Sequence, residues 1–97
     1  MPVWQNNGTL SIRYYDAQNG LNPWIEDKAN PDGVTELCHY DSTGQGLNAL
    51  LPFNGIVSLS GPGSRSLFIP GHPYNTSWNV TVHCDGTGQT LNFDVFY

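Results

Sequence analysis

Positive charge is the scarcest property of this sequence. Its 97 residues include three basic side chains against eight acidic ones, which gives a net charge of −5. A protein that binds nucleic acid or an anionic membrane surface gathers Lys and Arg to neutralise phosphates, and this sequence has no such cluster. We therefore expect no nucleic-acid partner, and we interpret the dispersed acidic residues as a solubility feature.

Long apolar runs and helix-forming segments are also missing. No apolar stretch reaches the roughly 18 residues of a membrane-spanning helix, so we expect no membrane insertion. Apolar residues recur with a helical period nowhere in the chain. What the sequence does contain is Asn, Gly, Ser and Thr, together with 12% aromatic residues. This composition favours strands joined by turns.

Alternation of apolar and polar residues predicts six to seven short antiparallel strands. The clearest strand covers 76–84, where Trp78, Val80, Val82 and Cys84 would share one face. Further strands are expected over 9–15, 34–40, 56–60, 64–69 and 90–97, with a short apolar piece over 47–53. The pattern predicts a single all-β domain over 1–97, either a small β-sandwich or a Greek-key barrel.

Two segments are predicted to lie outside the strands. Residues 21–33 contain two prolines and end in Asn-Pro-Asp-Gly, so we expect a long loop there. At most one short helical turn fits in it, over 23–29. The dipeptide Asn54-Gly55 predicts a tight hairpin turn.

A doubled motif organises the chain. Residues 39–48 (HYDSTGQGLN) and 83–92 (HCDGTGQTLN) agree at seven of ten positions. We interpret both copies as turns of two similar hairpins, with Gly44 or Gly88 supplying a positive φ. An internal pseudo-twofold duplication of the domain is an alternative that the sequence leaves open.

Each copy has a cysteine beside its histidine. Strand periodicity places Cys38 and Cys84 on an apolar face, and His39 and His83 on the opposite one. Two inward cysteines in a chain of low charge predict a disulfide, and with it a secreted, extracellular protein. The alternative is a pair of buried thiols in a reducing compartment.

No catalytic signature is present, so we expect a protein that is not an enzyme and has no cofactor. We considered His39 and His83, with Asp41 and Asp85, as ligands of a transition metal. Nothing in the sequence fixes their distances, so no metal site is predicted. The sequons at Asn7, Asn75 and Asn79 permit, but do not require, a glycoprotein.

Aromatic residues in polar segments give the functional prediction. Trp4, Tyr15, Trp24 and Tyr74 stand beside Asn, Asp and Gly, and such rings suit the apolar faces and hydroxyls of a sugar. The alternative is that some of these rings cover the ends of a small core. We predict a binding protein for carbohydrate or the cell surface, with a glycan or a cell-surface protein as partner; the oligomeric state is open.

A rival prediction uses residues 61–74. Arg65 and Phe68 stand there between Pro and Gly residues, and a braced, projecting loop would suit an inhibitor, effector or toxin directed at a protein. The alternative is an ordinary strand in which Leu67 and Ile69 point inward and only Phe68 is exposed.

Overall fold

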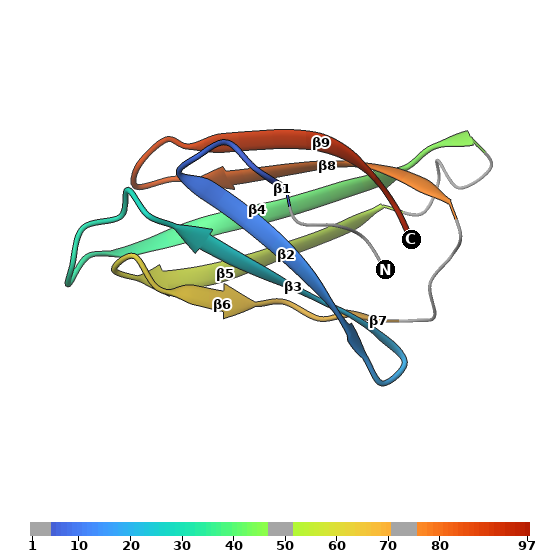
Figure 1. The fold of residues 1–97 in the computed structure, drawn as a ribbon, viewed down its shortest axis with the longest axis horizontal. Helices are drawn as coiled ribbons and strands as arrows, with labels where there is room; N and C mark the ends of the chain where they lie inside the picture. Colours follow the sequence, from blue (N-terminus) through green and yellow to red (C-terminus); the bar gives the residue numbers. More distant parts are fainter. Residues whose placement is uncertain (1–4, 47–51, 71–75) are drawn as a thin grey trace.

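Two antiparallel sheets, packed face to face, make up the fold of this computed structural model (Figure 1). The structure describes residues 5–46, 52–70 and 76–97. Sheet A has the order β1-β2-β3, and both β6 and β7 pair with the far side of β3. Its strands are β1 (Gln5–Asn6), β2 (Leu10–Ala17), β3 (Gly20–Asp27), β6 (Ser64–Ser66) and β7 (Ile69–Pro70).

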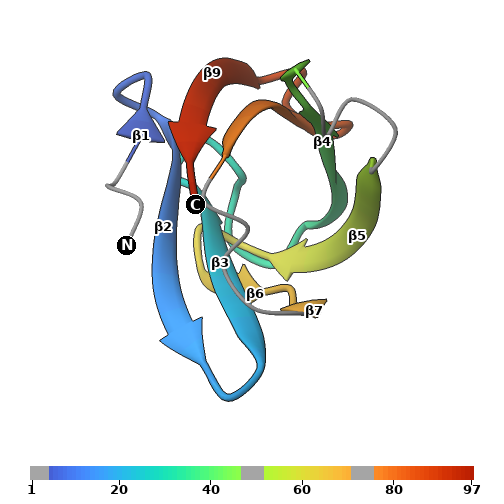
Figure 2. The ribbon, with the colours of Figure 1, turned by 90° about the vertical axis from the view of Figure 1, so that its right-hand side faces the viewer.

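Sheet B has the order β5-β4-β8-β9. Its strands are β4 (Thr35–Gly44), β5 (Phe53–Ser60), β8 (Ser77–Cys84) and β9 (Thr90–Phe96). The prediction of a small all-β sandwich is confirmed. Within the described ranges, no helix could span a membrane. The edges of the sheets approach each other where β5 meets β6 and where β9 meets β2 (Figure 2).

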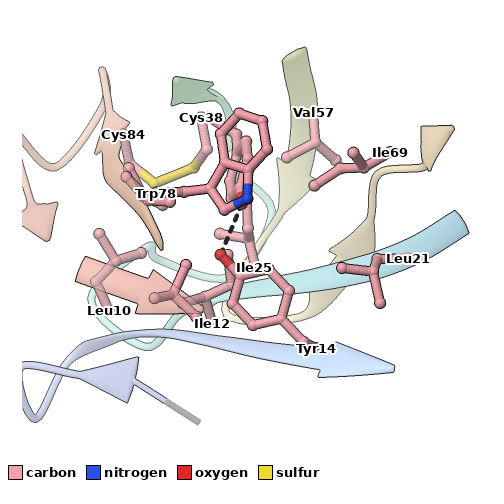
Figure 3. Close-up of a cluster of buried hydrophobic side chains, with 14 of the residues drawn as sticks. Leu10, Ile12, Tyr14, Leu21, Ile25, Cys38, Val57, Ile69, Trp78 and Cys84 are labelled. Atoms are coloured by element: carbon pink, nitrogen blue, oxygen red, sulfur yellow. Dashed lines mark hydrogen bonds between the residues drawn. A yellow bond between two sulfur atoms is a disulfide. The ribbon is translucent and has the colours of Figure 1, made fainter. Parts of the chain in front are cut away.

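The core fills the space between the two inner faces (Figure 3). Alternation explains its membership, since every second residue of β2 and of β8 is buried there, as predicted. The hydroxyls of Tyr14 on β2 and Tyr40 on β4 lie 2.6 Å apart and join the sheets by a buried hydrogen bond. Burial raises the pKa of both phenols, so both stay neutral. The rings of Trp78 and Tyr97 stack at a centroid distance of 5.2 Å.

The expectation of a loop or helical turn over 21–33 was wrong for its first half. Residues 20–27 form β3, in the middle of sheet A, with Pro23 opposite Tyr14. Pro23 accepts a hydrogen bond from the backbone N–H of Leu67 at 2.9 Å but has no N–H to return. The register of β3 with β6 continues unchanged into β7, so these are one edge strand that is interrupted opposite Pro23. The predicted turn at 30–33 is present, with Gly33 at a φ of 77°.

The doubled motif does not form two matched turns. The first copy continues β4 as far as Gly44, which pairs with Trp78 and has no positive φ. The second copy leaves β8 and turns as predicted, with Gly88 at a φ of 73°. The copies therefore have different local structures, which removes the support for an internal duplication. Residues 54–55 likewise lie within β5 and form no hairpin, and residues 47–51 fall outside the described ranges.

The disulfide prediction is confirmed. Cys38 and Cys84 are direct partners across β4 and β8, with an S–S bond of 2.05 Å and Cα atoms 4.0 Å apart. Both lie in the core, on the face that strand periodicity predicts. A buried disulfide fits an oxidising compartment.

A buried polar network closes one end of the sandwich beside this disulfide. Asp27 ends β3 and Glu36 begins β4, and both are buried. Thr87, in the turn after β8, donates from Oγ1 to Asp27 Oδ2 at 2.6 Å and from its backbone N–H to Glu36 Oε1 at 3.1 Å. The network therefore joins the ends of both sheets.

Candidate functional site

Sheet A has one face packed on sheet B and one face turned away from it (Figure 2). On β2 and β3 the inner positions are buried, and the intervening ones point away from sheet B. The antiparallel register places Arg13 directly opposite Trp24, and Trp24 opposite Ser66. Side chains far apart in sequence therefore gather on one surface.

A groove with a volume of about 530 Å³ lies on this face. It is open to solvent along the sheet, and three strands contribute to it. Its lining residues are Ser11, Arg13, Tyr15, Trp24, Glu26 and Ser64.

Two of the four predicted aromatic residues meet in this groove. Tyr15 and Trp24 have ring centroids 6.4 Å apart and nearly perpendicular planes, at 85°. The exposed fractions of Tyr15 and Trp24 are 47% and 40%, which is high for large aromatic side chains. The alternative that Trp24 covers an end of the core is therefore wrong. The other two predicted residues, Trp4 and Tyr74, lie outside the described part of the chain.

Phe68 extends the same aromatic surface. Residue 68 lies between β6 and β7, and its ring lies over Gly20, where any added Cβ would come within 2.8 Å of two ring carbons. Its exposed fraction is 48%. Leu67 is half-buried and Ile69 buried.

The expected projecting loop is thus, over residues 64–70, the interrupted edge strand formed by β6 and β7. Arg65 is exposed on β6, in register with Ile25. It is not among the residues that line the groove. Gly61, Pro62 and Gly63 precede the strand, and its pairing with β3 keeps it in sheet A. The remainder of the predicted segment, 71–74, is outside the described ranges.

The polar residues of the groove were not predicted. Ser11, Arg13 and Tyr15 share one face of β2 in the alternation, and that pattern alone identifies them as neighbours. To place Glu26 and Ser64 in the same groove, one must know how β3 pairs with the strands on both of its sides. The local sequence does not give that pairing.

The arrangement offers donors and acceptors around an apolar platform. Arg13 supplies a guanidinium group, Glu26 a carboxylate, and the two serines supply hydroxyls. Among the lining residues only Glu26 carries a carboxyl group, whereas most glycoside hydrolases place two carboxyl groups around the scissile bond. These groups can hydrogen bond to the hydroxyls of a ligand that lies against the two rings.

No protein-family model, curated protein or solved structure matches this chain.

Proposed function

We propose that this protein binds carbohydrate on the outer face of sheet A, without catalysis. The observation that carries the proposal is the exposed pair of Tyr15 and Trp24 inside a groove that is otherwise lined by polar side chains. A sugar ring presents apolar C–H groups on one face and hydroxyls around its edge. An indole ring can stack on the first, while Arg13 and Glu26 hydrogen bond to the second.

Rigidity supports the same proposal. The platform stands on two fully paired strands, β2 and β3, which hydrogen bond along their whole length. A ligand that docks on paired strands need not order a loop, so little conformational entropy is lost on binding.

We further propose that the protein acts outside the cell. The buried disulfide supports an oxidising compartment.

The sequons at Asn7 and Asn79 have side-chain amides that already hydrogen bond. Asn7 Nδ2 donates to Thr90 O at 3.3 Å, and Asn79 Nδ2 donates to Asp94 Oδ1 at 3.0 Å. A glycan would take one of the two hydrogens of Nδ2 and leave the other to donate, so these bonds do not exclude glycosylation at either site.

Glycan-array binding with the disulfide-intact protein tests the main proposal. We expect Trp24→Ala to weaken binding of any glycan hit by at least about tenfold, because it removes the stacking surface. Phe96→Ala is the matched control, since Phe96 is also an exposed aromatic ring but lies on β9 of sheet B. Absence of any glycan hit, or equal binding by Trp24→Ala, would refute the proposal.

A protein-directed function is the second candidate, because exposed Phe68 continues the same face. A protein partner on the outer face would cover Phe68 together with Trp24. Arg65 is in register with the buried Ile25, so a partner contacts it only by extending round the edge strand. Such a partner loses affinity in both Phe68→Ala and Arg65→Ala, whereas a small oligosaccharide bound over Tyr15 and Trp24 is insensitive to Arg65→Ala.

A further inference from the structure

We propose that His39, His83 and Asp85 form a surface site for a divalent transition-metal ion that favours imidazole, such as Cu²⁺ or Zn²⁺. The site lies on the outer face of sheet B, and it is independent of the proposed carbohydrate face on sheet A. The sequence pointed to both histidines but not to their placement.

The β4–β8 register brings the two histidines together. His39 and His83 are direct cross-strand partners, one position along from the disulfide pair. Side chains of directly opposed residues stand on the same face with Cβ atoms about 4.5–5.5 Å apart. That separation allows two imidazoles to share one ion at Zn–N distances of about 2.0–2.1 Å.

Asp85 supplies a third ligand group. Its Oδ2 lies 3.0 Å from His39 Nε2, and its Oδ1 lies 3.5 Å from His83 Nε2. The carboxylate thus lies within 3.5 Å of the Nε2 atom of each ring, and it hydrogen bonds to that of His39. An ion enters when the carboxylate moves aside and the two rings converge. All three side chains are at least one-third exposed, so this movement disturbs no packing.

Thr90 prepares one of the rings for this role. His83 Nδ1 and Thr90 Oγ1 form a hydrogen bond at 2.7 Å. When Nδ1 donates to the hydroxyl, the lone pair of the neutral ring is on Nε2, which faces Asp85. Metal-bound histidines commonly use their second nitrogen in this way, since the hydrogen bond fixes the tautomer and the ring orientation.

The charge of sheet B favours a cation. Its four strands carry the exposed carboxylates Asp41 and Asp94 but no Lys or Arg. Two imidazoles and one carboxylate select transition metals, whereas Ca²⁺ and Mg²⁺ prefer sites made of oxygen ligands alone. With solvent in the remaining positions, the ligand set suits Zn²⁺ or Cu²⁺.

Another cluster in the described part of the chain consists of metal-ligating residue types but cannot bind a metal ion. Ligand atoms of Glu36, Cys38 and Cys84 lie within 4.8 Å of one another. Both sulfur atoms are joined in the disulfide and offer no thiolate. The histidine site is the one that remains available while the disulfide is intact.

Calorimetric titration of the chelator-treated, tag-free protein with Zn²⁺, and with Cu²⁺ followed by electron paramagnetic resonance, tests the site. We expect one ion per chain and nitrogen couplings in the Cu²⁺ spectrum. His39→Ala, His83→Ala and Asp85→Asn should each weaken binding by at least about tenfold, since even partners outside the ligand shell contribute that much to affinity.

Asp41→Asn is the matched control, because it removes one negative charge from the same face, two positions further along β4 than His39. It should leave the affinity within about threefold of the parent. Circular dichroism of each variant checks that the sheet is intact. Binding that survives in the His39→Ala/His83→Ala double variant, or no binding of either ion below about 1 mM, would overturn the proposal.

Discussion

Glu36 is a carboxylic acid in a place that disfavours its charge. It is buried beside Asp27, and no donor among the described residues reaches its Oε2. Burial raises the pKa of Glu36, and a hydrogen bond to the neighbouring carboxylate of Asp27 raises it further, because only the protonated acid can donate. The folded protein therefore holds a proton that the unfolded chain releases near the ordinary pKa of 4.5.

The sign of the pH dependence follows from this difference. The stabilising contribution of Glu36 is fully present below about pH 4.5 and is lost as the pH rises through the elevated pKa of the folded state. We expect Glu36→Gln to remove that loss, since the amide stays neutral and can still donate to Asp27.

Urea denaturation between pH 4.5 and pH 8 measures this effect. Glu26→Gln is the control, because Glu26 lies on the outer face of sheet A, away from the network. A parent protein whose free energy of unfolding rises over this range, or a Glu36→Gln variant that keeps the parent's slope, would contradict the assignment.

At the scale of the element, the alternation of apolar and polar residues predicted β2, β8 and β9. In these strands the local sequence alone shows which side chains face the core. The alternation failed for β3, since two prolines and the ending Asn-Pro-Asp-Gly make residues 21–33 resemble a loop when the partner strands are unknown. Pro23 is tolerated because its missing N–H faces the edge strand, where one lost hydrogen bond merely divides β6 from β7. It failed again for the first copy of the motif, where pairing with β8 extends β4 through residues that favour turns.

Gly20 shows how closely the edge strand packs against β3. A Cβ at this position would collide with the backbone carbonyl oxygen of Ile69 and with the ring of Phe68. We expect Gly20→Ala to lower the free energy of unfolding by about 1–3 kcal/mol, as overpacking does, and to displace the Phe68 ring. Thermal and urea denaturation measure the change.

Gly63→Ala provides the comparison for Gly20→Ala. Gly63 has no positive φ, and its added Cβ would lie 3.5 Å from Ser60 O, an ordinary contact. We expect this variant to keep the stability of the parent to within about 0.5 kcal/mol. Equal stabilities of the two variants would show that β7 does not pack on Gly20 as described.

At the scale of the whole molecule, one covalent bond supplements a small core. The disulfide closes a loop with a sequence separation of 46. In the chain-entropy treatment, a loop of this length is worth about 4 kcal/mol. We expect the Cys38→Ala/Cys84→Ala variant to lose about 2–5 kcal/mol of unfolding free energy in urea denaturation.

Mass measurement gives an independent check of the bond. The non-reduced chain should have two fewer hydrogens than the reduced one, and reduction of the parent should reproduce the lower stability of the double variant. A parent whose mass and stability do not change with reductant would contradict the disulfide and the proposed extracellular setting.

The position of the disulfide also decides which strand alignment the chain can adopt. If β8 slid by two residues along β4, the apolar side chains would still face inward, but His39 would stand opposite Thr81 or Asp85 instead of His83. Because Cys38 and Cys84 are joined as direct partners, both of these near-equivalent alignments are covalently excluded. Formation of the disulfide thus selects one alignment of β8 on β4, and in that alignment His39 and His83 stand opposite each other on the surface.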